Sequence, residues 1–457
     1  MQSLRFMFDD ALLKKYEGQV PRYTSYPPAS EWVDSIDAYD FARGLIGAAE
    51  HPGPLSLYVH IPFCRTLCSY CGCNVVVGKG HESADAYLRT VAHEVRNAAG
   101  LLGSRRNVIQ LHWGGGTPTF LDERQLSELW FSLFERFKLA GGAEVSVEVN
   151  PATCTLSQLE RLAQLGFNRI SFGVQDLDPV VQRAVRRANV GPRLEELSQA
   201  ARKLGFRGIN YDLIYGLPGQ TLESWDRTLD RILELRPDRL AVYAFAFLPE
   251  QMPHQQQLDA SAIPAAGPKA ALFRRAWERL TKGGYTSIGM DHFALPDDEL
   301  SRAQQQGKLR RNFQGYTAAP ATDVVAFGPS AISDIDGLYA QNIRELEGYA
   351  HAVQAKRFAT LRGYRLTADD RVRRRVIEEI MCNFTCDLGS LSPWAREVEG
   401  LKTFVDDGLV SLEGGRVTVT PPGRFFVRNI AHVFHAPASK VTAAVRLMSA
   451  QGPVARA

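Results

Sequence analysis

Of the seven cysteines in the chain, four lie between residues 64 and 73, in the segment YVHIPFCRTLCSYCGCNVVV. Cys64, Cys68 and Cys71 are spaced Cys-x3-Cys-x2-Cys, so three thiolates on one short loop could hold three irons of a 4Fe-4S cluster and leave the fourth iron open. Structural zinc is the alternative, although zinc usually draws its thiolates in two separated pairs. The spacing alone leaves open whether Cys73 is a fourth ligand.

The elements that must position this loop alternate between short β-rich runs and helical patterns from about residue 55 to 250. Such alternation predicts parallel strands joined by helical crossovers, with the chemistry at the carboxyl ends of the strands. Helical spacing of Leu126, Leu129, Trp130, Leu133 and Phe137 predicts a helix that packs on the sheet. The six expected strands are Leu57–Ile61, Ile109–Trp113, Glu144–Val149, Arg169–Val174, Ile209–Ile214 and Arg239–Phe245.

A weak internal repeat supports this interpretation, because LAQLGFNRISFGV at 162–174 and ARKLGFRGINYDL at 201–213 share a helix end, a glycine and a strand. Gly166 and Gly205 are placed where a helix commonly ends in a left-handed glycine. Thr155 and Gln158 have the spacing of a capping box, which predicts a helix start. The repeat therefore defines one strand-helix unit at both ends.

The rest of the chain adds to this core. After residue 250 we expect a loop at 252–269, a helix at 270–280 and short strands at 286–290 and 324–327. Thr367 and Asp370 predict a cap for a helix running to about Cys382, and LVSLEGGRVTVT at 409–420 predicts a hairpin turning at Gly414 and Gly415. The expected fold is an α/β protein with an open (β/α)6 partial barrel and extra strands. Its expected domains are an N-terminal arm (1–50) that covers the site, a catalytic barrel (51–360) and a small, mainly helical, winged-helix-like C-terminal domain with a β-wing (361–457).

Composition excludes several classes of protein. The 457 residues are 45% hydrophobic and 23% charged, which is typical of a globular chain, and a net charge of +3 indicates no general affinity for nucleic acid or anionic membranes. The N-terminus carries Asp9 and Asp10 and shows no signal-peptide pattern. No run approaches the roughly 18 apolar residues that cross a bilayer. We therefore expect a cytoplasmic protein without membrane insertion, in which crowded cysteines indicate metal or redox chemistry.

The cysteine spacing, Tyr70 just before the third cysteine and the position after a first strand resemble the radical S-adenosylmethionine (radical SAM) superfamily. HWGGGTPT at 112–119 resembles the superfamily segment that holds the methionine moiety, and Glu148 matches a carboxylate that binds ribose hydroxyls. Taken alone, a glycine run is more often a turn and Glu148 a solvated strand end. The resemblance implies that the open iron binds S-adenosylmethionine and that cleavage gives a 5′-deoxyadenosyl radical.

Five segments together narrow the resemblance to the oxygen-independent coproporphyrinogen III dehydrogenase (oxidase) family, from about residue 20 to 435. They are PRYTSYPPA at 21–29, Cys-Gly-Cys at 71–73, SFGVQD at 171–176, MDHFALPDDEL at 290–300 and RNFQGYT at 311–317. The family converts two propionates of coproporphyrinogen III to vinyl groups in haem biosynthesis, releasing carbon dioxide and giving protoporphyrinogen IX. A propionate β-carbon has no acidic proton, so a carbon radical suits this reaction better than a general base.

The resemblance implies one 4Fe-4S cluster with three cysteine ligands, two S-adenosylmethionine molecules, and Cys73 as a nearby residue needed for activity. A spare cysteine is the alternative for Cys73, and a surface charge for Arg187. An acid such as Asp212, inside the apolar run INYDLIYG, requires a partner. The residues matching the cluster-bound molecule are Tyr58, Gly115, Glu148, Ala246 and Ile332, and those matching the second molecule are Tyr70, Gly116, Thr117, Gln175, Arg187 and Asp212.

A tetracarboxylate substrate favours arginines that grip carboxylates, for which Arg22, Arg310 and Arg311 are candidates. We expect Tyr23 and Tyr26 of the N-terminal arm to close over the substrate together with Arg22; the alternative is an arm tied to the barrel. AFAFLP at 244–249 departs from the family pattern, which is more polar there.

The nearest rival function is a haem-binding chaperone of the same superfamily branch, whose members lack Cys73 and the PRYTSYP arm. Nucleic-acid binding through the C-terminal wing would need a clustered basic recognition helix, which the sequence does not show. We expect a monomer that uses an unidentified electron donor and electron acceptor.

Overall fold

The computed structural model describes residues 10–16, 18, 20–78, 80–187, 190–319, 321, 323–355 and 358–436. The chain divides into a larger unit, Asp34–Arg310 with Tyr316–Arg365, and a smaller unit, Met1–Val33 with Arg311–Gly315 and Leu366–Ala457. Residues 1–9 and 437–457, into which the expected terminal domains extend, lie outside the described residues. The expected domain boundaries stay predictions. Within the described ranges, no helix is both long and apolar enough to cross a membrane.

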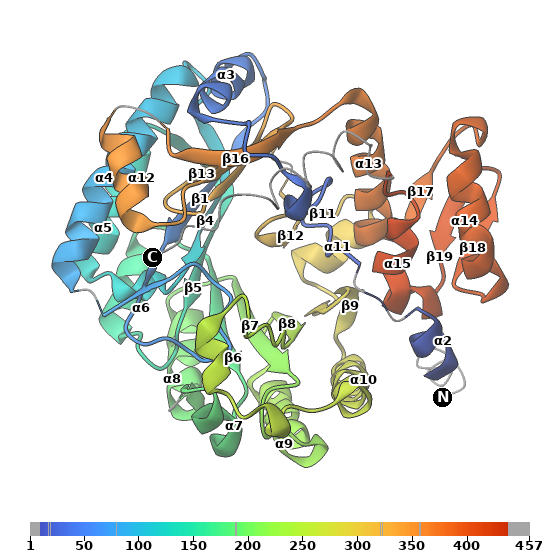
Figure 1. The fold of residues 1–457 in the computed structure, drawn as a ribbon. Helices are drawn as coiled ribbons and strands as arrows, with labels where there is room; N and C mark the ends of the chain where they lie inside the picture. The colour runs from blue at the N-terminus through green and yellow to red at the C-terminus, as the bar shows by residue number, and fades with distance from the viewer. Residues whose placement is uncertain are drawn as a thin grey trace, which may run out of the picture. The chain divides into compact units, whose positions relative to one another are not determined.

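The larger unit is organised around a sheet with twelve strands among the described residues (Figure 1). From β13 (Asp323–Phe327) to β8 (Arg239–Ala244), neighbouring strands of this sheet run parallel. Antiparallel strands extend the sheet beyond both β13 and β8. The order is β16 (Thr360–Arg365), β15 (Leu338–Asn342), β14 (Ile332–Ile335), β13 (Asp323–Phe327), β1 (Leu55–Ile61), β4 (Asn107–Gly115), β5 (Lys138–Val149), β6 (Arg169–Gln175), β7 (Gly208–Tyr215), β8 (Arg239–Ala244), β10 (His292–Ala294) and β9 (Thr286–Gly289).

All six expected parallel strands are confirmed, as β1 and β4 to β8. The strand expected at 324–327 is β13, and it pairs in parallel with β1, with Leu57 opposite Val325. The expectation of a plain loop at 252–269 is wrong. Two short 3-10 helices, Pro253–Gln257 and Ala260–Ala262, occupy it, and helix α10 already begins at Ala266.

Helices follow the parallel strands along the outside of the sheet (Figure 1). The expected capping box is confirmed: Thr155 accepts a hydrogen bond from the backbone of Gln158 and the Gln158 side chain accepts one from Thr155. Gly166 and Gly205 adopt φ of 98° and 90°, so both end a helix as expected. The helices of this unit are α3 (Ala38–Ala49), α4 (His81–Leu101), α5 (Glu123–Phe134), α6 (Leu156–Gln164), α7 (Pro179–Ala184), α8 (Val190–Lys203), α9 (Leu222–Leu235), α10 (Ala266–Lys282), α11 (Glu299–Gln305) and α12 (Leu346–Gln354).

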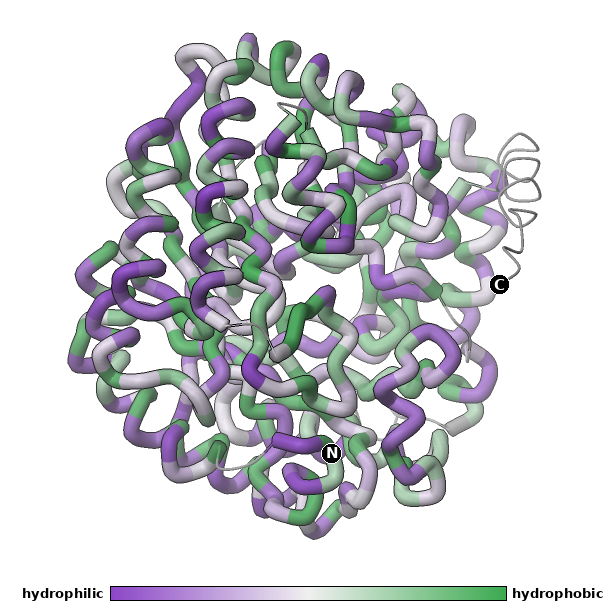
Figure 2. The backbone as a smooth tube through the Cα atoms, turned by 60° about the vertical axis from the view of Figure 1, so that its left-hand side comes forward, coloured by the Kyte–Doolittle hydropathy of each residue, from purple (hydrophilic) through white to green (hydrophobic). Residues whose placement is uncertain are grey.

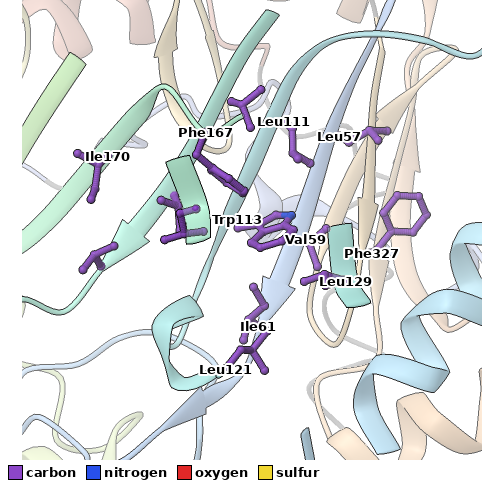
Figure 3. Packing of buried hydrophobic residues seen from close by; sticks show 14 of the residues in the cluster. Leu57, Val59, Ile61, Leu111, Trp113, Leu121, Leu129, Phe167, Ile170 and Phe327 are labelled. Atoms are coloured by element: carbon purple, nitrogen blue, oxygen red, sulfur yellow. The ribbon is translucent and has the colours of Figure 1, made fainter. Parts of the chain in front are cut away.

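The hydrophobic core lies between the parallel strands and their helices. Trp113 of β4 is fully buried, with the Phe167 ring 4.7 Å from its own, and Leu129 of α5 lies in the same cluster (Figure 3). Hydrophobic and hydrophilic residues alternate along the outer helices (Figure 2), as amphipathic helices on a sheet require. This packing fixes the carboxyl ends of the strands, where the polar motifs lie.

One buried carboxyl group interrupts the core. Glu94 of α4 accepts hydrogen bonds from the Gly328 N–H at 2.9 Å, the Asn342 amide at 2.7 Å and the Tyr349 hydroxyl at 2.7 Å. Burial raises the pKa of Glu94 from 4.5 to about 7, although these hydrogen bonds favour the carboxylate. The folded chain therefore keeps this proton at pH values where the unfolded chain has lost it.

Stability should consequently fall as the pH rises from about 4.5 to about 7, because the unfolded state then binds fewer protons than the folded state. The full effect is at most about 3 kcal/mol. Urea unfolding of wild type and Glu94→Gln between pH 5 and 8 should give a shallower decline for the variant, which cannot ionise. The exposed Glu160→Gln is the control. Equal pH slopes for wild type and Glu94→Gln would contradict the assignment.

The smaller unit combines the N-terminal segment with a helical C-terminal region. Its helix α13 (Ala368–Asn383) begins at the expected cap of Thr367 and Asp370. Strands β18 (Val410–Glu413) and β19 (Arg416–Val419) form the expected hairpin. Helix α2 (Asp10–Lys15) precedes Tyr16, whose ring stacks on Phe404 at 4.7 Å. This unit also contains β17 (Thr385–Asp387), α14 (Ala395–Asp406), α15 (Val427–His432) and the 3-10 helices Ala29–Glu31, Ser392–Trp394 and Pro422–Phe426.

Candidate active site

The cysteine loop begins directly after β1, at the carboxyl end of the parallel strands. It leaves through β2 (Phe63–Cys64) and returns through β3 (Val76–Val77), which pair in parallel and close the loop at its base. Cys64, Cys68 and Cys71 line one cavity of about 370 Å³, together with Cys73. The fold therefore gathers all four clustered cysteines at one place.

Each of the three candidate ligand sulfurs has a polar neighbour. The sulfur of Cys64 lies 3.3 Å from the Thr117 hydroxyl, and Arg187 Nη1 donates to the sulfur of Cys68 at 3.4 Å. The backbone N–H of Cys73 donates to the sulfur of Cys71 at 3.4 Å. Hydrogen bonding from the Cys73 side chain, opposed by burial, lowers the pKa of Cys71 to about 7. Burial raises the pKa of Cys64 to about 11.

The arrangement fits a cluster better than a single ion. Among the described residues, no three His, Cys, Asp or Glu side chains are arranged to hold one metal ion. Zinc needs its ligands converged on one point, whereas a 4Fe-4S cluster takes each thiolate on a different iron. Three thiols spread around one cavity, on a loop without a second cysteine pair, match the cluster.

Three consecutive glycines, Gly114 to Gly116, lie beside the start of the cysteine loop; Gly115 and Gly116 line the cavity, and none of the three has room for a side chain. A Cβ at Gly114 would lie 2.9 Å from the Glu148 carboxylate, and one at Gly115, where φ is 111°, would lie 2.7 Å from the His60 ring. At Gly116 it would lie 2.8 Å from backbone atoms of Pro62 and Phe63. Here the backbone itself must approach its neighbours closely.

Glu148, at the end of β5, is held in place as a carboxylate. It accepts from the Gly115 N–H at 3.0 Å, and its other oxygen lies 3.2 Å from His112 Nε2. Burial would raise its pKa, but the hydrogen bonds and the charge of His112 outweigh burial and lower it. His112 is oriented in turn by the Ser146 hydroxyl, 2.6 Å from its Nδ1. The sequence alone did not assign His112 a role.

A second group of predicted residues lines the same cavity: Tyr70, Gln175, Arg187 and Asp212. Gln175 adopts φ of 67°, in the left-handed region that side chains rarely occupy. Arg187 donates through Nη2 to the Gly173 carbonyl.

Asp212 has the partners that its apolar strand demanded. It accepts from the Ser171 hydroxyl at 2.8 Å and from the Asn210 amide at 2.9 Å. Burial raises its pKa to about 6.

Three predicted residues do not line the cavity. Tyr58 lies behind it, with its ring stacked on His112 at 5.8 Å and its hydroxyl 3.2 Å from His60 Nδ1. Ala246 follows β8, and its carbonyl accepts from the Gln255 amide at 3.1 Å. Ile332 begins β14 and pairs with Gln341.

The candidate substrate residues are not gathered at the cavity either. Arg22, Tyr23, Tyr26 and Arg311 belong to the smaller unit, and Arg310 is exposed at the end of the larger one. Within the smaller unit, the Tyr23 hydroxyl lies 2.6 Å from His432 Nδ1, and the Tyr26 hydroxyl accepts from the Ala436 N–H at 3.0 Å. Both tyrosines are therefore buried against the C-terminal helix region.

Sequence reasoning missed several cavity residues. Asn150 and Thr153 follow β5, Ile214 lies on β7 and Tyr243 on β8. Asn150 follows Glu148 at a strand end, which is a usable signal. Tyr243 carries no local signal, because its neighbours in sequence are apolar.

Comparison with known proteins agrees with this geometry. A model of the radical SAM superfamily matches residues 58–232, and a model of the HemN C-terminal domain matches residues 366–426. The oxygen-independent coproporphyrinogen III oxidase of Escherichia coli strain K12 is 43% identical over 436 residues, covering 93% of this chain and 95% of that protein. The enzyme of the same name from Pseudomonas aeruginosa is 41% identical over 438 residues, covering 93% and 95%.

A solved structure extends the likeness to the fold. Coproporphyrinogen III oxidase (HemN) from Escherichia coli, described as a radical SAM enzyme, aligns with a TM-score of 0.89 and 42% identity, covering 94% of this chain and 98% of that one. Identity at this level over nearly the whole length of both chains establishes the family. The chain belongs to the oxygen-independent coproporphyrinogen III oxidase family of radical SAM enzymes.

Proposed function

We propose that this enzyme converts two propionate side chains of coproporphyrinogen III to vinyl groups without oxygen, giving protoporphyrinogen IX and two carbon dioxide molecules. The observation that carries the proposal is the near full-length identity to enzymes of that name. The site supports it, because one cavity combines thiols, glycine backbone and the carboxyl groups of Glu148 and Asp212.

Cys64, Cys68 and Cys71 would hold the 4Fe-4S cluster as its three protein ligands. When bound, the reduced cluster and S-adenosylmethionine supply a carbon radical that can take hydrogen from an unactivated propionate carbon. The Cys73 N–H donates to the Cys71 sulfur at 3.4 Å, and hydrogen bonding from Cys73 lowers the pKa of Cys71, which favours the thiolate form that binds iron.

Glu148 would bind the ribose hydroxyls of the cluster-bound S-adenosylmethionine, since the Gly115 N–H and His112 hold its carboxylate ready. Gly115 leaves room for the cluster-bound molecule. By the family likeness, Tyr58, Ala246 and Ile332 would also contact that molecule. We place a second S-adenosylmethionine against Tyr70, Gly116, Thr117, Gln175, Arg187 and Asp212.

The proposed second molecule gives a test through Arg187. An Arg187→Met protein should keep its iron but bind one equivalent of S-adenosylmethionine, with the second weakened by at least roughly tenfold, because the guanidinium contacts to Cys68 and Gly173 are lost. Anaerobic equilibrium dialysis measures the stoichiometry. Arg183→Met, at an exposed position on α7 just before Arg187 in the chain, should bind two equivalents. Two equivalents at wild-type affinity in Arg187→Met would refute the placement.

The proposed reaction is tested anaerobically. Reconstituted enzyme with S-adenosylmethionine, a reductant and coproporphyrinogen III should form protoporphyrinogen IX and 5′-deoxyadenosine. Tight haem binding without decarboxylation would instead support a haem chaperone of the same superfamily. Arg22, Arg310 and Arg311 are our candidates for the substrate carboxylates, and each change to Met should raise KM for coproporphyrinogen III.

A further inference from the structure

Outside the cavity, three buried side chains form a polar cluster that the reaction does not use. Asp176, Gln220 and Thr228 are 1%, 5% and 1% exposed. One oxygen of Asp176 accepts from the Thr228 hydroxyl at 2.6 Å, and the other accepts from Gln220 Nε2 at 2.6 Å. We call these three residues the loop clamp. A buried polar network of this kind is costly unless every member has a partner.

The loop clamp ties together three segments of the chain. Asp176 directly follows β6, Gln220 lies in the loop after β7, and Thr228 lies on α9. Gln220 Oε1 accepts from the Gly216 N–H at 2.6 Å and from the Leu217 N–H at 3.3 Å, so it fixes the start of that loop. Both loops leave the carboxyl ends of strands that carry cavity residues.

Helix α7 connects the loop clamp to the cysteine loop. At its start, the Asp178 N–H donates to Asp176 Oδ1 at 2.8 Å, and Gln182 Nε2 donates to the Asp176 carbonyl at 2.9 Å. At its end, the Val185 carbonyl accepts from the Ser69 N–H of the cysteine loop at 3.1 Å.

The end of α7 also reaches the candidate cofactor groups. Arg187, just beyond the helix, contacts the sulfur of Cys68. On its apolar side, Val181 and Val185 pack with Leu217 and Phe245, and Tyr70 of the cysteine loop lies against this group. The end of the segment from Asp176 to Arg187 is therefore joined to the cysteine loop by both polar and apolar contacts.

We propose that Asp176 and Gln220 are positioning residues that set α7, and through it Arg187 and the Cys68 side of the cysteine loop, for S-adenosylmethionine binding. The inference rests on the proposed cofactor sites and adds residues that do not line the cavity. Neither side chain lines the cavity, so a change in the loop clamp acts through the segments that it holds, α7 foremost among them.

The test reverses which side chain donates the hydrogen bond between Gln220 and Asp176. In Asp176→Asn, one amide N–H must face another donor, because Gln220, Thr228 and the Asp178 N–H all donate to this side chain. We expect normal iron content but S-adenosylmethionine affinity reduced by roughly 10- to 100-fold. In Asp176→Asn with Gln220→Glu, the amide donates to the new carboxylate, which still accepts from Gly216 and Leu217 but no longer donates to the Ile214 carbonyl. Affinity should therefore rise clearly above that of Asp176→Asn without fully reaching wild type.

The readouts are S-adenosylmethionine binding by anaerobic dialysis and the change that it causes in the electron paramagnetic resonance spectrum of the reduced cluster. Neither needs a porphyrinogen, so failure here is distinct from failure of the proposed reaction. Ser198→Ala is the control: it removes a buried 2.6 Å contact to Tyr211 of β7 that does not reach the cavity. This control should lose thermal stability and keep its affinity.

Two results would overturn the proposal. One is wild-type affinity and spectrum in folded Asp176→Asn. The other is a folded double variant that remains as weak as the single one. If Asp176→Asn does not fold, Thr228→Val replaces it, since this near-isosteric change removes one hydrogen bond from Asp176 and one from the Leu177 N–H. Unchanged affinity in Thr228→Val would count against the proposal equally.

Discussion

A Cys71→Ser protein is expected to lose S-adenosylmethionine cleavage, whereas a Cys73→Ser protein is expected to keep its iron and lose porphyrinogen turnover. Cys71 lines the cavity with Cys64 and Cys68, and hydrogen bonding from Cys73 lowers its pKa to about 7. A thiolate is the form that binds iron. Loss of a direct ligand should exceed the roughly 100-fold that loss of an indirect contact costs.

The measurement is iron and sulfide per chain after anaerobic reconstitution, followed by the yield of 5′-deoxyadenosine. Cys382→Ala, on α13 of the smaller unit, controls for the general effect of removing a cysteine and should keep full iron. If Cys73→Ser lost iron as completely as Cys71→Ser, Cys73 would be a fourth ligand. Full iron and full turnover in Cys73→Ser would make it a spare cysteine.

Gly116→Ala should be the most damaging single-methyl change in the glycine segment. The new Cβ would lie 2.8 Å from backbone atoms of Pro62 and Phe63, which cannot turn away as a side chain can. The Gly116 N–H also donates to the Ile61 carbonyl at 2.8 Å, so the glycine cannot shift without breaking that bond. We expect a loss of about 1–3 kcal/mol in stability and no measurable S-adenosylmethionine cleavage.

Gly100→Ala is the matched control, because a Cβ there meets nothing within 4 Å and the position lies inside α4. Alanine should stabilise that helix by up to about 1 kcal/mol. Urea unfolding and anaerobic cleavage assays on both variants give the comparison. A Gly116→Ala protein with wild-type stability and cleavage would show that the cysteine loop and the glycine segment are not in close contact.

Local sequence patterns predicted many of the strands and helices correctly. The six strands follow from β-rich runs, and the start of α6 from the spacing of Thr155 and Gln158. The sequence did not predict which distant segments pair or contact each other. The run at 324–327 reads as a strand, but nothing in its own residues says that Val325 pairs with Leu57 of β1.

The same limit separates the predicted site residues from the missed ones. Asp212 can be identified from the sequence, because an acid in an apolar strand needs hydrogen-bond partners. In the structure, Ser171 and Asn210 are those partners. Asp176 and Gln220 are ordinary polar residues in loops, and only the folded chain places them 2.6 Å apart. Tyr243 reaches the cavity only because β8 lies beside β7.

The pairing of β1 with β13 joins two strands that are synthesised far apart in time. During synthesis, β1 leaves the ribosome with its cysteine loop long before β13, since Leu55 pairs with Asp323. At about 5–20 residues per second, that interval lasts roughly 13 to 54 seconds, during which one edge of the central strand stays open. An open apolar edge invites pairing with other chains. Until its last parallel strand arrives, the nascent chain therefore carries one unpaired edge of β1.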